Sequence, residues 1–276
     1  MYINCDVPFS SDVEKFKELI HFLYRIGYQA AIVNVNSIKE YRELLKTNLI
    51  VRKPTDIGYP VSIKTLLKYK VKELPIPLIP KITIHPKNAH KLKNELGSVI
   101  NFKTLVAVET TDKNTLEVAA RDGRVDSLSV PTAQHQKALS KGILSLARQN
   151  DCVLAINISH LIFHRSISRT RDMRTLYRLI MKAKVNSYKY ALGSFIGNPW
   201  NARGPKENIA MLVSLFDVPE FWAKSIVATN SEELVLRFIK RDLGLFIESG
   251  TEIVFKKEPP KTEKQLHETK QEVRKS

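Results

Sequence analysis

Short apolar runs rich in β-branched residues recur along this chain, and segments with helical periodicity lie between them. This alternation is typical of βα units around a parallel sheet whose strands are buried on both faces. Eight such strands favour a closed (β/α) barrel over an open doubly wound sheet, and no GxGxxG motif follows any of them to support a dinucleotide fold. The predicted strands are residues 2–7, 29–35, 48–52, 81–84, 105–110, 127–130, 152–157 and 188–193.

Helical patterns fill the intervals and continue after the last strand. They cover residues 11–26, 37–46, 61–69, 86–96, 114–121, 133–149, 170–186, 205–216, 219–228 and 231–243. Ser10 or Ser11 is expected to cap the first helix, and Asn114 or Thr115 the fifth. Asn230 is expected to cap the last helix.

We therefore expect a single (β/α) barrel domain over residues 1–250. Two segments depart from the pattern. Residues 52–80 contain five prolines and predict an irregular excursion over the barrel surface. Residues 251–276 form a polar tail of mixed charge, which we expect to be disordered.

The charge of the chain indicates a polyanionic partner. Lys and Arg number 44 against 28 Asp and Glu, a formal net charge of +16. Nucleic acid is the first candidate, because binding phosphates releases condensed counterions, and an acidic membrane surface is the second. The amino terminus lacks a signal-peptide pattern and no apolar run is long enough to span a membrane, so we expect a cytoplasmic protein.

Nearly half of the net charge lies in residues 164–189, which hold eight Arg or Lys and one acid. On a helix, Arg171, Arg174, Arg178 and Lys182 fall within one narrow stripe, opposite a mainly apolar side. The planar guanidinium suits phosphate oxygens, so the stripe favours phosphate binding, although a solvated helix face would have the same pattern. Arg165 and Arg169 are placed in the loop before this helix.

A catalytic constellation is not apparent in the sequence. In a (β/α) barrel, functional residues sit at the carboxyl ends of the strands. The candidates there are Asp6, Asn34, Asn36, His85, Glu109, Ser129, Asn157, Ser159 and Ser194. They are mostly amides and hydroxyls, and Cys5 and Cys152 are expected to be buried core residues. We therefore predict no catalytic residues and no metal ligands, and leave a stand-alone metal-dependent phosphoesterase on the same barrel as the alternative.

From Leu105 onward, an ordered set of motifs resembles a known family. The set begins with LVAVETTDKNTLEVAARDGRVDSLSVP, with Glu109 at the strand end, and continues with CVLAINISHLIFHRSISRTRDMRTLYRLIMKAKV. A strand ending at Ser194 follows, then Arg203, Pro205 and a helix that ends near Asp217. These motifs resemble archaeal ribonuclease P protein component 3, the counterpart of the eukaryotic thirty-kilodalton subunit.

The resemblance implies a TIM-like barrel related to the polymerase and histidinol phosphatase barrels, without their metal ligands. It implies a protein subunit of the ribonucleoprotein endonuclease that removes 5′ leaders from precursor tRNA. The chain would bind structured RNA and support the catalytic RNA subunit, on which Mg²⁺ is expected, and would bind no cofactor itself. Its partners would be the catalytic RNA, precursor tRNA, a small ferredoxin-like subunit and other ribonuclease P proteins, with no membrane.

The predicted RNA-binding residues combine the basic stretch with the last motif of the resemblance. Their contacts with phosphates would give position and affinity rather than sequence readout. They are Arg165, Arg169, Arg171, Arg174, Arg178, Lys182, Ser194 and Arg203.

Beside the RNA-binding subunit and the metal-dependent phosphoesterase, a third possibility is that the barrel acts mainly as an assembly platform for the small partner subunit.

Overall fold

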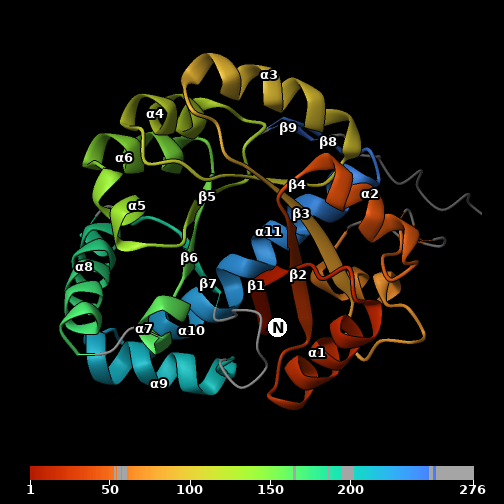
Figure 1. Ribbon diagram of the computed structural model, residues 1–276, viewed down its shortest axis with the longest axis horizontal. Helices are drawn as coiled ribbons and strands as arrows, with labels where there is room; N and C mark the ends of the chain where they lie inside the picture. Colours follow the sequence, from red (N-terminus) through yellow and green to blue (C-terminus); the bar gives the residue numbers. More distant parts are fainter. Residues whose placement is uncertain are drawn as a thin grey trace, which may run out of the picture.

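Seven strands form one parallel sheet whose spatial order follows the chain order (Figure 1). The computed structural model describes residues 1–52, 54, 57, 61–163, 166–185, 187–193, 202–248 and 251–252. The strands are β1 (Ile3–Pro8), β2 (Ala30–Val35), β3 (Leu78–Ile84), β4 (Leu105–Val108), β5 (Ser127–Val130), β6 (Val153–Asn157) and β7 (Tyr190–Gly193).

The sheet curls until its two edges meet. At Gly193 of β7, an added Cβ would lie 2.6 Å from the Cβ of Asp6 in β1, so a glycine is needed for this approach. The result is a nearly closed barrel surrounded by helices, which confirms the predicted fold class.

The predicted strand at residues 48–52 is wrong. Asn48 follows α2 with a left-handed φ of 56°, and residues 49–52 form no strand. Leu49 is buried in the layer between barrel and helices, while Arg52 reaches Asp242 near the other end of the chain. A short apolar run can serve a loop as well as a strand, and here tertiary contacts decide between them.

Helices cover the outside of the barrel, and 3₁₀ and π turns join some of them. They are α1 (Val13–Arg25), α2 (Ile38–Lys46), η1 (Ile63–Tyr69), α3 (Ala89–Val99), η2 (Ile100–Phe102), α4 (Lys113–Arg121), α5 (Ala133–Ala138), α6 (Lys141–Gln149), α7 (Ser159–Phe163), α8 (Ser166–Val185), α9 (Pro205–Phe216), α10 (Glu220–Lys224), η4 (Ser225–Thr229) and α11 (Asn230–Asp242).

Several helix ends differ from prediction. Asp12 and Asp112 cap α1 and α4 through their carboxylates, instead of the neighbouring Ser or Asn residues. The predicted helix at 133–149 is two helices, because Leu139 is extended and Ser140 caps α6 through the Ile143 N–H. α11 has no side-chain cap, since the π turn η4 runs directly into it.

Two apolar cores hold the barrel together. The outer core packs the helices against the outward-facing side chains of the strands. The inner core fills the amino-terminal half of the barrel, where Ile3, Ile32 and Leu105 meet Leu234 and Phe238 of α11. α11 therefore closes the amino-terminal end of the barrel.

Buried ion pairs fix α11 in this position. The carboxylate of Asp126, at the start of β5, accepts bonds from Arg241 at 2.7 and 2.9 Å and from the Val106 N–H at 2.8 Å. Asp242 accepts bonds from Arg52 at 2.6 Å and from the Tyr69 hydroxyl at 3.1 Å. Residues far apart in the sequence thus join the last helix to the barrel.

The predicted excursion and the predicted tail are described only in part. The excursion over 52–80 contains η1, and its remaining described residues before β3 form no other helix or strand. Strands β8 (Phe246–Glu248) and β9 (Thr251–Glu252) pair as a hairpin, so the first two residues of the predicted tail belong to it. Residues 253–276 lie outside the described residues. Among the helices that the structure describes, none is both long and apolar enough for a membrane span.

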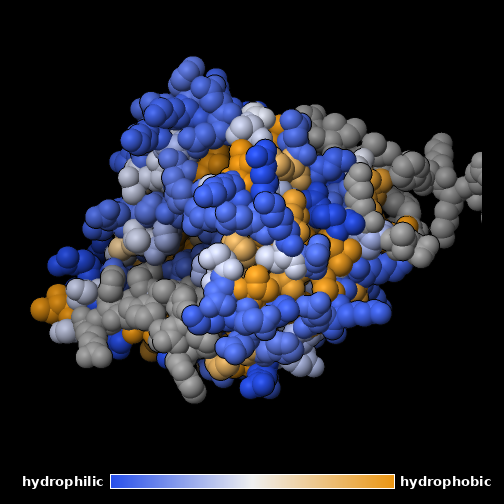
Figure 2. Space-filling model, turned by 45° about the vertical axis from the view of Figure 1, so that its right-hand side comes forward, coloured by the Kyte–Doolittle hydropathy of each residue, from blue (hydrophilic) through white to orange (hydrophobic). Residues whose placement is uncertain are grey.

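Exposed apolar side chains concentrate on three helices. Figure 2 shows one face of the molecule, on which hydrophilic residues predominate and hydrophobic ones gather near the centre. Among the described residues, six of the nine large apolar side chains that stay exposed belong to α8, α9 and α10. They are Ile167, Tyr177, Val185, Val213, Leu215 and Phe221.

Candidate RNA-binding surface

Helix α8 follows β6 after the short α7 and packs against α5 and α7 on the outside of the barrel (Figure 1). Leu176, Leu179, Ile180 and Ala183 are buried on its inner face. Asp172, the only acid of the helix, lies buried among them. The solvent-facing side of α8 therefore carries no negative charge.

Arg171, Arg174 and Arg178 are exposed on the outer face, as the periodicity predicts. No carboxylate among the described residues lies within ion-pair distance of these three guanidinium groups. Some surface cations are paired within their own helix, for example Arg121 with Glu117 at 2.6 Å. The three α8 arginines are not paired in this way and remain available to an external anion.

The remaining predicted residues lie around this helix. Arg169 lies in the first turn of α8, not in a loop, because the helix begins four residues earlier than predicted; its Nη2 donates to the Ile162 carbonyl at 3.2 Å. Lys182 is half-buried on the flank of α8. Arg203 is exposed just before α9, where its carbonyl accepts a bond from the Tyr28 hydroxyl at 2.9 Å. Arg165 and Ser194 lie outside the described residues.

The carboxyl-terminal mouth of the barrel contains a polar cluster. Lys81 of β3 is only 2% exposed, and its ammonium donates to the Asp6 carboxylate at 2.9 Å and the Cys5 carbonyl at 3.1 Å. Asn157 donates to the second Asp6 oxygen at 3.0 Å. Both oxygens of the Asp6 carboxyl group are thus engaged by neighbouring side chains.

Lys81 was missed as a mouth residue, although the sequence carried a signal. A lysine in the middle of the apolar strand LIPKITI must be paired if its strand is buried. The other mouth residues also bind one another: the Thr83 hydroxyl donates to Asn34, and the Ser159 N–H donates to Asn157 at 2.9 Å. Asn36 is exposed, and its N–H donates to Glu40 at 2.8 Å.

A second group surrounds Glu109, at the end of β4. The Ser129 hydroxyl donates to Glu109 at 3.0 Å, and nitrogens of His85 and His135 lie 3.6 and 4.0 Å from its other oxygen. Burial lowers the pKa of His135, and Glu109 only partly offsets this effect. Among the described residues, no group of His, Cys, Asp and Glu has the arrangement of a metal site.

Because its pKa is lowered in the folded protein, His135 makes the free energy of unfolding depend on pH. Above pH 6.5, His135 is neutral in both the folded and unfolded states, whereas below it the unfolded chain takes up a proton more readily than the folded one. We expect the free energy of unfolding to fall as the pH drops from 6.5 toward 5, and the fall to be smaller in His135→Asn. Urea titrations at each pH measure it, with the exposed His21→Asn as control. An equal fall in His135→Asn and the unmodified chain would contradict the assignment.

The two cysteines offer no reactive thiolate. Both are buried and free, as predicted, and burial raises the pKa of each thiol to about 12. They stay protonated at neutral pH and pack as small apolar residues.

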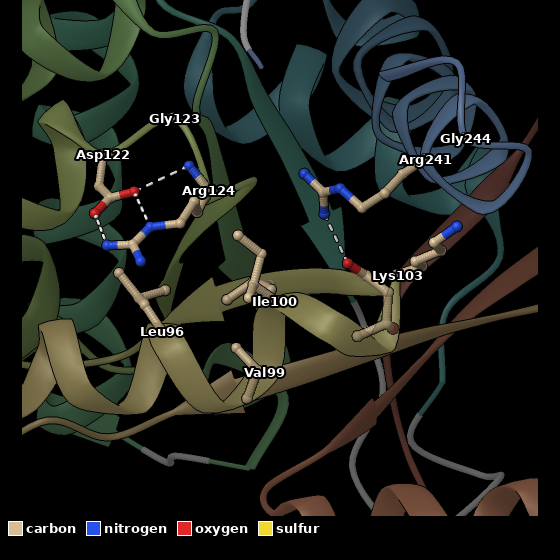
Figure 3. Close-up of a pocket in the computed structure, with 11 residues that line it drawn as sticks. Leu96, Val99, Ile100, Lys103, Asp122, Gly123, Arg124, Arg241 and Gly244 are labelled. Carbon is tan, nitrogen blue, oxygen red and sulfur yellow. Dashed lines mark hydrogen bonds and ion pairs between the residues drawn. The ribbon is translucent and has the colours of Figure 1, made fainter. Parts of the chain in front are cut away.

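A pocket of about 430 Å³ lies at the opposite, amino-terminal end of the barrel (Figure 3). Leu96, Val99 and Ile100 form its apolar wall, and Arg124 and Arg241 border it. Both arginines are engaged by aspartates, Arg124 by Asp122 at 2.6 Å and Arg241 by Asp126. The two arginines of this pocket therefore serve the packing of α11 and the loop before β5.

These features define a basic (β/α) barrel whose mouth carboxylates are hydrogen-bonded within the protein and whose outer helix presents arginines that no described carboxylate pairs. Residues 1–243 match the family described as RNase P subunit p30, and the chain belongs to that family. It is a protein subunit of ribonuclease P, the ribonucleoprotein endoribonuclease of tRNA processing, which confirms the family resemblance seen in the motifs.

The fold has a counterpart among solved structures. The chain superposes on a protein chain of the cryo-EM structure of archaeal ribonuclease P with mature tRNA, with a TM-score of 0.66 and 16% sequence identity. The match covers 93% of this chain and 100% of that chain. No curated protein matches the sequence. At this identity the likeness supports the fold.

Proposed function

We propose that this subunit binds structured RNA of ribonuclease P through the outer face of α8 and thereby supports the catalytic RNA. One observation carries the proposal: the exposed face of α8 presents Arg171, Arg174 and Arg178 without a carboxylate partner among the described residues. Unpaired guanidinium groups on a rigid helix are suited to phosphate oxygens in fixed positions.

The proposed contacts extend beyond these three residues. Arg169 and Lys182 lie on the same helix, and Arg203 adds a cation at the start of α9. Arg165 and Ser194 complete the proposed set on sequence grounds. Contacts of this kind recognise the shape of folded RNA and do not distinguish one base sequence from another.

We place hydrolysis on the RNA subunit with its bound Mg²⁺, and propose that the protein contributes no catalytic group and no metal ligand. The mouth of the barrel supports this division. Asp6 is bound by Lys81 and Asn157, and Glu109 by Ser129, so both carboxylates are already engaged by neighbours.

The proposed partners are the catalytic RNA, precursor tRNA, a small ferredoxin-like subunit and further ribonuclease P proteins. The similar archaeal chain comes from an assembly that contains mature tRNA, which supports RNA and tRNA as partners here. The exposed apolar residues of α9, Val213 and Leu215, offer a surface for a protein subunit.

Reconstitution tests the proposal. Cleavage of precursor tRNA by the RNA subunit and the other proteins is measured at low Mg²⁺ with and without this chain. We expect the chain to raise the rate, and the chain alone to cleave nothing. An unchanged rate would overturn the supporting role, and cleavage by the purified chain without RNA would favour the alternative of a metal-dependent phosphoesterase.

A further inference from the structure

A groove of about 440 Å³ lies where the end of α8 meets the turn between α9 and α10. The loop after α8 and the beginning of α10 form its sides. Its lining residues are Lys184, Ser187, Tyr188, Lys189, Pro219, Phe221, Trp222, Ser225 and Asn230.

The groove combines aromatic rings with lysines. Phe221 is 78% exposed, which is unusual for a side chain of this size. Trp222 is partly buried and held edge-on against Tyr190, with the ring centres 5.7 Å apart and an interplanar angle of 84°. The Lys184 ammonium lies 6.0 Å from the centre of the Trp222 ring. An exposed ring thus stands beside a rigid one and a cation.

The charge of the lining is positive. No carboxylate lines the groove among the residues that the structure describes. Lys189 is paired with Glu233 at 2.7 Å, and the nearby Glu220 is paired with Lys224 at 2.6 Å. Lys184 has no carboxylate partner within the part of the chain that the structure describes. The groove therefore offers one ammonium without a carboxylate partner, over the Trp222 ring, in the same lining as the exposed Phe221 ring.

The groove continues the surface of α8. Tyr177 is 43% exposed and precedes Lys184 by seven residues, so both lie on the same flank of the helix. The three arginines of the proposed RNA surface lie on the adjacent outer face of that helix. An RNA strand bound along α8 would reach the groove at the end of the same element.

We propose that this groove holds an unpaired nucleotide of the RNA, with its base stacked on Phe221 and its phosphate bound by Lys184. The proposal rests on the proposed function, because it extends the RNA surface of α8. Aromatic rings beside cations are the usual platform for single-stranded nucleotides, since every base has a face that can stack.

The lining distinguishes this occupant from an apolar protein segment. No Leu, Ile or Val is among the described lining residues, whereas hydroxyl and amide groups of Ser187, Ser225 and Asn230 are. The aliphatic exposed residues, Val213 and Leu215, lie on α9 outside the lining. Ser225 and Asn230 already form hydrogen bonds within the protein, but a docked apolar helix would take the Lys184 ammonium out of water without giving it an anionic partner.

The test uses the full chain and a labelled short oligoadenylate as probe, with fluorescence anisotropy as the readout at low salt. We expect Phe221→Ala to weaken binding about fivefold or more, which is the usual effect of removing one stacking ring. Phe221→Tyr should bind normally, and Phe221→Leu should bind as poorly as Phe221→Ala, because only a ring can stack. Leu67→Ala is the matched control for loss of exposed apolar surface, since Leu67 of η1 is 59% exposed and lies outside the groove, and it should leave oligoadenylate binding unchanged.

The outcomes separate this inference from the function on which it rests. A fully paired RNA duplex should bind Phe221→Ala as well as the unmodified chain. Unchanged oligoadenylate binding by Phe221→Ala, or normal binding by Phe221→Leu, would overturn the groove alone. Loss of binding to an isolated protein subunit in Phe221→Ala, with oligoadenylate binding intact, would identify a protein-docking site instead. If neither RNA binds the unmodified chain at low salt, both proposals fail.

Discussion

Replacing Arg171, Arg174 and Arg178 together by Ala will flatten the salt dependence of structured-RNA binding. The slope of log K against log salt should become smaller by about three, roughly one for each phosphate that the variant no longer neutralises. Affinity at low salt should fall by at least about tenfold, because each charge-assisted hydrogen bond contributes about 1.5–3 kcal/mol. Filter binding or anisotropy over a range of salt concentrations measures both quantities.

The fold should survive this change, since all three side chains are exposed and none is paired with a described carboxylate. A matched variant replaces Lys87, just before α3, and Lys91 and Lys93 of α3 by Ala, which removes the same formal charge from another exposed surface. This control should keep the slope and lose little affinity. Equal losses in both variants would show that net charge alone attracts the RNA, and would remove α8 as the binding surface.

Asp126→Ala should destabilise the protein by about 3–5 kcal/mol, because it leaves the largely buried Arg241 guanidinium without its carboxylate partner. The Asp126 side chain is 0% exposed and holds Arg241, itself only 14% exposed, in a bidentate pair. It also accepts the Val106 N–H, so its loss leaves a strand donor unsatisfied. Urea unfolding followed by circular dichroism measures the change.

The surface pair Asp122–Arg124 provides the control. Its charges are 2.6 Å apart, as close as the buried pair, but Arg124 is 37% exposed to water. Asp122→Ala should therefore cost no more than about 1 kcal/mol. The double variant Asp126→Ala with Arg241→Ala should recover part of the loss, because it removes the closer of the two arginines that Asp126 pairs, while Arg237, 3.4 Å from Asp126, still loses its partner. Equal effects of Asp122→Ala and Asp126→Ala would show that α11 does not depend on this pair.

Much of the fold could be predicted from local pattern. Seven of the eight proposed strands exist, because buried parallel strands are continuous apolar runs with a clear length. The run at 48–52 has the same composition, but its role is set by Arg52 reaching Asp242, a contact that spans most of the chain. Local pattern carries no information about such a contact.

The candidate surface was predictable for a similar reason. A helix repeats every 3.6 residues, so the buried and exposed faces of α8 follow from the spacing of Leu176, Ile180 and Arg174. The groove at Phe221 could not be predicted from the sequence, because its aromatic and cationic residues come from α8, the loop after α8 and α10. Only the folded chain brings these together.

The closure of the barrel by α11 has a consequence for how the protein is made. The last helix supplies Leu234 and Phe238 to the interior, so residues near 240 complete a core that begins at Ile3. Nearly the whole barrel must leave the ribosome before α11 can pack into the inner core. During synthesis the nascent strands expose their inward apolar face, and we expect chaperones to engage this chain until α11 emerges.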